Sequence, residues 1–360
     1  LAEILPEAAQ VEIPPTLSDN VTLSTMHGCP PEEIEQIAHH LLTKRKVHTT
    51  VKMNPTLLGP DLLRALLNQQ AGFSEVDVPD AAFEHDTKYE DAVAMIRRLR
   101  DTAQREGLAF GLKLTNTLEV RNHRPVFPEG QDMMYMSGRA LHPLSVAIAK
   151  RLTDELGHTV PISFAGGADA FNIVDILASG LSPVTVCTDL LKSGGYMRLR
   201  DYFENILDAM RSSGVDSLGD LALAQAAAQP SFSNEFQGVV AHEGQVRKLS
   251  APDNSPDELP TQKLEQAQES LTQALGSRSE DEPLSKALRS WRATVNDPGV
   301  VGAFEAAARR LSLQGYAREL LSRKGATARA VPMDTKSDKP LGWFDCVEAP
   351  YAKRRSEEHT

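Results

Sequence analysis

The sequence contains little cysteine, few aromatic residues and no long apolar run. Its three cysteines are an odd number and lie in unrelated local contexts, so we do not expect a disulfide framework. No stretch approaches the roughly 18 uninterrupted apolar residues of a membrane-spanning helix. The first ten residues also lack the basic and apolar regions of a secretory signal peptide. These absences predict a cytoplasmic protein without a membrane span.

Basic residues are fewer than acidic ones. The net charge of −11 argues against a protein that binds the phosphate backbone of nucleic acids, because such proteins need clustered lysine and arginine. Hydrophobic residues make up 41% of the chain and charged residues 24%, which is typical of a globular protein. The length of 360 residues suggests about two domains. We therefore expect a small-molecule partner and no nucleic acid.

Between about residues 21 and 210, short β-rich runs alternate with amphipathic helical stretches. This pattern predicts parallel strands joined by crossover helices, with an α/β fold. The helices are predicted over 30–42, 89–105 and 171–178. Six strands are predicted, over 21–25, 48–54, 74–79, 108–115, 160–166 and 183–188.

Downstream of about residue 209 the composition shifts to Ala, Gln, Ser and Asp, and we expect no further strand. Helices are predicted over 262–275, 283–295 and 300–324. We interpret this part of the chain as a linker and a helical connector rather than an independent active domain.

Polar residues follow several of the predicted strands, at the end where parallel βα proteins place their sites. Lys52 and Lys113 each close an apolar strand, where an unpaired ammonium group is costly to bury. One such lysine alone is usually a surface residue. Two of them, followed by Asn54 and Asn116, indicate a lining that offers positive charge and amide hydrogen bonds to a heteroaromatic ring. Beside a flavin, such a lysine would stabilise negative charge on the reduced ring.

Two glycine-containing loops follow the last two predicted strands. Gly166 and Gly167 stand between a strand and a helix, so their backbone amides can approach an anion at the helix N-terminus. Alone, such a pair is more often a tight turn. The next strand exit contains Thr188 and Lys192, and phosphate sites in (β/α)₈ barrels commonly use the last two loops together. The two loops therefore predict a phosphorylated ligand.

The remaining candidates for chemistry are cysteines and histidines. Cys29 precedes a predicted helix whose N-terminus would favour a thiolate, but it equally fits a small buried side chain. Cys187 lies in an apolar run and is expected in a core. His27 is either a base or a loop residue, and no carboxylate at a telling spacing completes a nucleophilic triad. No metal site is expected, because the adjacent His39 and His40 cannot face one ion from a helix.

Six segments occur in the order typical of one known family. They are VTLSTMHGCPPEEIEQIA, VKMNPTLLG, FGLKLTNT, MYMSGRALHPLS, ISFAGGADAFNI and TVCTDLLKSGGY. Together they resemble the flavin-dependent barrel of dihydroorotate dehydrogenases and of the FMN domain of dihydropyrimidine dehydrogenase, and more closely the selenate reductase subunit family. The resemblance covers residues 18–203 and implies a (β/α)₈ TIM barrel with bound FMN.

The resemblance also implies roles for individual residues. Cys29 would exchange a proton with the substrate opposite the flavin, although some relatives have serine there. The other residues form three groups: Lys52, Asn116 and Thr117 would contact FMN or substrate; Gly166, Gly167 and Thr188 would hold the FMN phosphate; and Asn54, Ser137 and Gly138 would bind the substrate near the ring.

Members of the family continue past the barrel into an FAD- and NADPH-binding module, introduced by a cysteine-rich iron–sulfur segment. Residues 344–350 resemble the opening of that segment, but Tyr351 replaces its next cysteine and the residues after it look non-native. The chain therefore looks like an internal fragment that lacks two barrel strands and the electron-input module. We divide it into a partial barrel (1–210), a linker (211–261), a helical connector (262–343) and the truncated start of the iron–sulfur segment (344–360).

The leading hypothesis is an FMN-dependent oxidoreductase domain within a larger NADPH-, FAD- and iron–sulfur-dependent reductase. It would move a hydride between the flavin and a small unsaturated, heterocyclic substrate. A phosphate-binding barrel lyase or isomerase is an alternative, in which Lys52 or Lys113 forms a Schiff base. A non-catalytic barrel scaffold in a reductase complex is a third hypothesis, and the polar strand ends count against it.

Overall fold

The structure is a computed structural model. It describes residues 17–24, 27–122, 130–229, 261–279 and 282–322, together with 236, 238–240 and 243. The predictions for Cys346 and for residues 344–360 lie outside the described residues.

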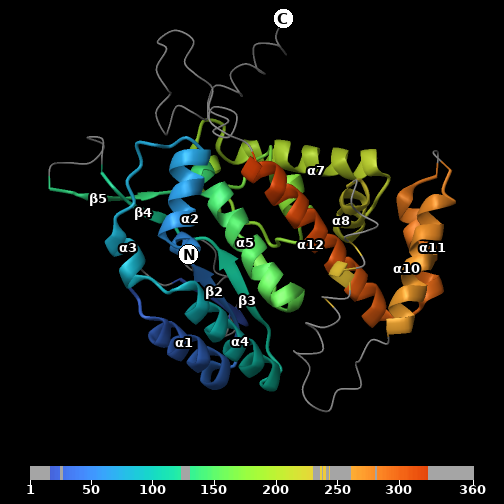
Figure 1. Ribbon diagram of the computed structural model, residues 1–360, viewed down its shortest axis with the longest axis horizontal. Coiled ribbons are helices and arrows are strands. Elements are labelled where there is room, and N and C mark those ends of the chain that lie inside the picture. The colour runs from blue at the N-terminus through green and yellow to red at the C-terminus, as the bar shows by residue number, and fades with distance from the viewer. Residues whose placement is uncertain are drawn as a thin grey trace, which may run out of the picture.

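A four-stranded parallel sheet forms the centre of the larger part of the molecule (Figure 1). Its order is β1 (Asn20–Ser24), β2 (His48–Met53), β3 (Phe110–Leu114) and β6 (Ile162–Phe164). All four strands were predicted from the alternating pattern. The helices that connect them, or that follow the last strand, are α1 (Pro31–His40), α2 (Pro60–Arg64), α3 (Asp80–His85), α4 (Tyr89–Arg105), α5 (His142–Leu156) and α6 (Ile173–Ala178).

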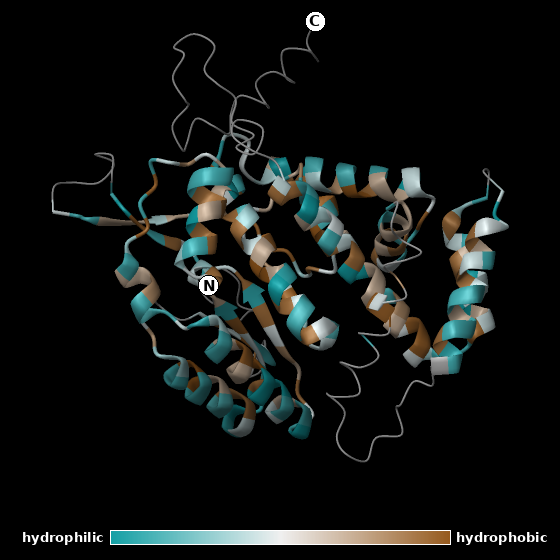
Figure 2. Ribbon diagram, in the orientation of Figure 1, coloured by the Kyte–Doolittle hydropathy of each residue, from teal (hydrophilic) through white to brown (hydrophobic). Residues whose placement is uncertain are grey.

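The two faces of this sheet differ in polarity. Val51, Leu112 and Phe164 are fully buried on one face, where they belong to the main hydrophobic core together with residues of α1, α4 and α5. The alternate residues, among them Lys52 and Lys113, are partly exposed. The outer sides of α1 and α4 are largely hydrophilic (Figure 2). The sheet therefore carries its helices on an apolar face and leaves a polar face available.

Two of the six predicted strands are wrong. Residues 74–79 form a loop, in which Val76 and Val78 are buried against the main core without joining the sheet. Residues 183–188 make one isolated parallel bridge, from Val184 to Phe164, before the backbone turns into a 3₁₀ helix at Thr188. The alternation of apolar residues in both segments reflects their burial in loops, so the described sheet has four parallel strands and not the predicted six.

An antiparallel ribbon that the sequence did not suggest lies beside the sheet. It pairs β4 (Leu118–Arg121) with β5 (Met133–Met136). The loop at 74–79 contacts this ribbon, because the Arg121 amide donates to the carbonyl of Asp77 at 2.8 Å. The hydrophobic alternation of that loop is thus explained by contact with an element outside the parallel sheet.

The downstream part is helical, as predicted, and no strand occurs among its described residues. The segment assigned as a linker, 211–261, contains a helix at 218–227, because Leu221, Leu223 and Ala226 are apolar and pack into a second core. The downstream helices are α7 (Leu199–Ser213), α8 (Leu218–Ala227), α10 (Thr261–Gly276), α11 (Leu284–Val295) and α12 (Pro298–Ser322).

Helix α12 belongs to both cores. Its residues Phe304 and Leu311 belong to the second core, and Leu313 and Ala317 further along belong to the main core. In Figure 1 it runs beside α5, and Gln314 donates to Asp154 of that helix at 3.0 Å. The helical part is therefore joined to the sheet by a continuous helix.

Candidate active site

The first group of predicted residues meets at the carboxyl ends of β2 and β3. Lys52 is the register partner of Lys113, and Ser24 and Ser163 flank this pair on the outer strands. Neither ammonium group has a hydrogen bond or ion pair within the described part of the chain. Burial lowers the pKa of Lys52, and the charge of Lys113 lowers it further. The polar face of the sheet thus concentrates positive charge that no described carboxylate neutralises.

A chain of hydrogen bonds fixes the amides beside these lysines. The Asn116 side chain donates from Nδ2 to Asn54 Oδ1 at 2.7 Å and accepts from Ser24 Oγ at 3.1 Å. The Asn116 backbone amide donates to the Met53 carbonyl at 2.8 Å, which continues the pairing of β2 and β3. The structure therefore brings Asn54 and Asn116 together next to Lys52.

The second group of predicted residues lies on the loop after β6. Three successive carbonyl groups of this loop accept hydrogen bonds from side chains: Gly166 from His142, Gly167 from Asn172 and Ala168 from Tyr202, each at 3.1 Å. In a trans peptide the N–H points away from the carbonyl. The amides of Gly167 and Ala168 accordingly point away from these donors, and no described residue accepts from them.

Unpaired backbone amides that are half-buried or buried are uncommon, and two successive ones form a concavity that suits an anion. Gly167 is partly exposed and Ala168 is buried. We refer to these two amides as the amide nest. Two free N–H donors on one loop suit an anion, and the resemblance assigns the FMN phosphate to this loop.

The glycines of the loop are required for packing as well. A Cβ atom at Gly166 would overlap the Ser145 side chain, and one at Gly167 would overlap the Gly138 carbonyl. A Cβ at Gly138 would lie 2.9 Å from Thr188. The structure therefore brings the loops of Gly138, Gly167 and Thr188 into contact. A bulkier residue at Gly167 would disturb this contact, so it would not test phosphate binding alone.

Ser137 and Thr188 complete this group, and the Thr188 hydroxyl donates to Ser137 Oγ at 3.4 Å. Ser137 is exposed, whereas Thr188 is half-buried. Both hydroxyls lie on loops that contact the amide nest, so the structure places Ser137 of the predicted substrate group beside Thr188 of the predicted phosphate group.

Charged side chains surround the amide nest. Asp189 is buried and accepts from Lys192 at 2.8 Å, from Arg198 at 2.9 Å and from Tyr202 at 2.9 Å. Burial alone would raise the pKa of Asp189, but the hydrogen bonds from Arg198 and Lys192 hold it below its usual value. Arg139 donates to Asp169 at 2.7 Å. Three cations thus accompany two carboxylates, and an anion at the nest would meet net positive charge.

His142 links this loop to the helical part of the molecule. Its Nδ1 lies 3.1 Å from the Gly166 carbonyl, which can only accept, so Nδ1 donates and Nε2 accepts from the Tyr316 hydroxyl. Burial lowers the pKa of His142 to about 4. The ring is therefore neutral near pH 7, in the tautomer that this arrangement requires. The contact of His142 with Tyr316 could not be predicted from the sequence, since the two residues are 174 positions apart.

Cys29 and Thr117 lie at the exits of β1 and β3. Cys29 is half-buried against the main core, and burial raises the pKa of its thiol, as does the charge of Glu33. Both effects favour the protonated thiol over the thiolate. Cys187 is exposed rather than packed in a core, because its run joins the sheet at only one bridge.

The sequence reasoning missed a carboxylate close to Cys29. Asp86 lies 59 positions from His27, yet its Oδ2 is 2.9 Å from His27 Nδ1. The other ring nitrogen, Nε2, lies 3.0 Å from the Thr117 carbonyl. A spacing this long gives no local sequence signal, so only the fold reveals the pair.

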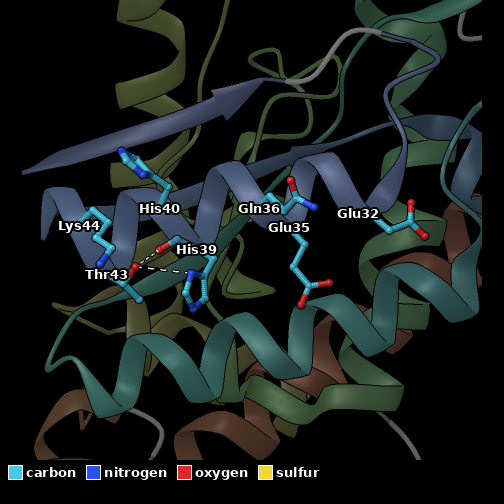
Figure 3. Close-up of a pocket in the computed structure, with 7 residues that line it drawn as sticks. All are labelled: Glu32, Glu35, Gln36, His39, His40, Thr43 and Lys44. Atoms are coloured by element: carbon cyan, nitrogen blue, oxygen red, sulfur yellow. Dashed lines mark hydrogen bonds between the residues drawn. The ribbon is translucent and has the colours of Figure 1, made fainter.

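A hollow of about 470 Å³ on α1 and the turn that follows it is a poor candidate site (Figure 3). It is lined by one continuous helical segment on the outer side of the sheet's helices. His39 and His40 point in different directions there. Within the described residues no cluster of histidine, cysteine and carboxylate side chains is arranged to bind a metal. The described chain likewise contains no helix that is both long and apolar enough to cross a membrane.

The fold and these sites define the class of protein. Residues 3–236 match the family model of the oxidoreductase YgfK N-terminal TIM-barrel domain, and the chain belongs to that family. It is an oxidoreductase TIM-barrel domain of mixed α/β structure, with a parallel sheet and a mostly helical remainder.

Curated relatives include the protein named as oxidoreductase YgfK from Escherichia coli strain K12, and its counterpart from Escherichia coli O157:H7. Each is 46% identical to this chain over 193 residues, which are 54% of this chain and 18% of the relative. The chain thus spans about a fifth of the length of these relatives.

Solved structures that resemble the chain include two crystal structures of DHODH from Eimeria tenella. One is in complex with ferulenol, with a TM-score of 0.30 and 17% identity over 53% of this chain and 57% of the other. The other is ligand-free, with a TM-score of 0.29 and 16% identity over 53% of this chain and 59% of the other.

Proposed function

We propose that this oxidoreductase domain binds FMN along the carboxyl edge of its parallel sheet and reduces or oxidises a small unsaturated substrate there. The observation that carries the proposal is a pair of unsatisfied groups on that edge. The amide nest of Gly167 and Ala168 suits a phosphate, and the unpaired Lys52 and Lys113 suit a ring that becomes negatively charged. FMN has both features in one molecule.

FMN, when bound, would supply hydride transfer. The described residues contribute binding, orientation and proton transfer. Lys52 would stabilise negative charge on the ring, while Asn54 and Asn116 would orient the ring or the substrate with their amides. Thr188, Ser137 and Gly138 would line the space between ring and phosphate. The Cys29 thiol is protonated near neutral pH, so it would give a proton to the substrate and take it back in the reverse reaction.

The wider context of the domain is also a proposal. A small heterocyclic substrate and a role in a selenate reductase follow from the resemblance, and a cytoplasmic location is the expectation of the sequence analysis. The same resemblance suggests electrons from a module with NADPH, FAD and iron–sulfur clusters, either fused or separate. The curated relatives are long enough to contain such a module.

A lyase or isomerase that uses Lys52 as a Schiff base is a second candidate. It is favoured by the lowered pKa of Lys52 next to another cation, since such a lysine is a better nucleophile. The oxidoreductase family membership weighs against it.

Flavin analysis of the purified full chain tests the proposal. Absorbance and mass spectrometry should find FMN in equimolar amount with the wild-type chain and with the Lys44→Met control, whose lysine lies in the outer hollow on α1. Lys52→Met should retain much less. A chain that binds no flavin but becomes covalently trapped by borohydride with a carbonyl substrate would support the lyase instead.

A further inference from the structure

His27 is held between two hydrogen-bond acceptors. Its Nδ1 lies 2.9 Å from Asp86 Oδ2, and its Nε2 lies 3.0 Å from the carbonyl oxygen of Thr117. An ionised carboxylate and a backbone carbonyl can only accept hydrogen bonds. Both ring nitrogens can therefore donate only when the imidazole carries two protons. The geometry selects the charged form of His27.

Asp86 is built to remain ionised. Its side chain is only 2% exposed, and it accepts from the Gly28 amide at 3.0 Å and from the Thr56 hydroxyl at 2.6 Å in addition to His27. Burial alone would raise the pKa of Asp86, but these donors hold it below its usual value. Gly28 has a φ of 82°, a backbone conformation that residues other than glycine rarely adopt. This conformation belongs to the turn that directs the amide towards the carboxylate.

The groups around His27 favour its charged form. Burial alone would lower the pKa of His27, but the hydrogen bond and charge of Asp86, with a further contribution from Glu119, raise it above the usual value. The Tyr135 ring of β5 stacks on the imidazole with 5.7 Å between centroids. His85 of α3 lies beside Gly28. Besides the Asp86 and Glu119 carboxylates, His85 and the Tyr135 hydroxyl are titratable groups near His27.

We propose that His27 and Asp86 form a charged clamp that fixes the loop of Cys29 against the end of β3 at Thr117. This proposal rests on the proposed function, because it makes His27 a positioning residue for the proton-donating thiol of Cys29. The clamp joins three elements: the exit of β1, the end of α3 and the exit of β3. Cys29 follows His27 by two residues, so the position of its thiol depends on the hydrogen bonds of His27 to Asp86 and Thr117.

Cysteine labelling tests the clamp without any flavin. The full chain is treated with iodoacetamide, and the alkylation rates of Cys29 and Cys187 are measured by mass spectrometry, with the exposed Cys187 as internal reference. In His27→Gln and Asp86→Asn the ratio of the Cys29 rate to the Cys187 rate should rise about tenfold, the factor expected for one lost charge-assisted hydrogen bond. The control His40→Gln, on the surface of α1, should leave the ratio unchanged.

A second measurement uses only the wild-type chain. Nitrogen-15 NMR of the wild-type histidines should show both ring nitrogens of His27 protonated at pH 7. The Cys29 to Cys187 ratio should rise once the pH passes the pKa of His27. A singly protonated His27 at pH 7, or an unchanged ratio in both variants, would overturn the clamp. Either result leaves flavin binding untouched, so this proposal and the proposed function can fail separately.

Discussion

At the carboxyl edge of the sheet, Lys52, Lys113 and two loop amides lie without partners in the described chain. In the helical core, by contrast, the Trp291 and Arg292 side chains are paired. In that core, Trp291 donates from its indole to the Ala267 carbonyl at 2.9 Å, and Arg292 pairs with Asp220 at 2.5 Å. Unpaired polar groups cost stability when they are buried. The difference indicates that the helical core is organised for stability and the sheet edge for a ligand.

The largest effect on stability is expected in the helical core. Phe304 is fully buried and packs edge-on against Phe236 at 5.3 Å. Phe304→Ala should lower the free energy of unfolding by about 3–5 kcal/mol, because it leaves a cavity among aromatic rings. Urea denaturation measures this change. A loss below about 1 kcal/mol would show that this core does not stabilise the chain, and the comparison would fail.

Acid should destabilise the junction between the two regions through His142. Its pKa falls from 6.5 to about 4 on folding, so the unfolded chain binds a proton more readily than the folded one between these values. The contribution is fully present above pH 6.5 and is lost as the pH falls towards 4, by roughly 3 kcal/mol in total.

Denaturation curves at several pH values check this. His142→Gln should be less stable than the wild type at pH 7 but should lose less stability towards pH 4. The exposed His40 provides the control, since His40→Gln should follow the wild-type profile. Parallel profiles for wild type and His142→Gln would show that His142 is not the buried neutral group described above.

A smaller effect is expected at Tyr316. Tyr316→Phe removes the hydroxyl that donates to His142, and it should cost about 1 kcal/mol of unfolding free energy. Tyr196→Phe is the matched control, because Tyr196 is 79% exposed and should show no change. Equal stability of the two variants would mean that the hydrogen bond between Tyr316 and His142 does not stabilise the contact of α12 with the loop of Gly166.

Lys52 should show the smallest effect on stability and a large one on ligand binding. Lys52→Met removes a half-buried cation that faces Lys113, so the free energy of unfolding should change by less than about 1 kcal/mol. Chemical denaturation of the flavin-free chain measures this. A loss of several kcal/mol would assign Lys52 to the fold rather than to a ligand.

Much of the sheet could be predicted from the sequence, because β2, β3 and β6 each bury one face and β1 half-buries one, and their residues alternate accordingly. The same signal failed at 74–79, where the buried valines pack from a loop. The pattern measures burial and not hydrogen bonding, so it cannot separate the two cases. The ribbon of β4 and β5 was missed because MMYM at 133–136 has no alternation.

The site residues were predictable where they stand at strand ends. Lys52, Asn54 and Asn116 follow directly from that position, and the structure brings them together. The contacts of Asp86 with His27 and of Tyr316 with His142 could not be predicted, since the partners lie far apart in the sequence. The roles assigned to Cys29 and to the amide nest stay predictions.

The most direct test of the central claim compares FMN with riboflavin, which lacks only the phosphate. Equilibrium dialysis with the full chain should show FMN bound at least about tenfold more tightly, as expected for charge-assisted hydrogen bonds to the amide nest. Asn172→Leu, which releases the Gly167 carbonyl, should reduce this ratio while riboflavin affinity stays the same. Equal affinity of the wild-type chain for FMN and riboflavin would contradict the account.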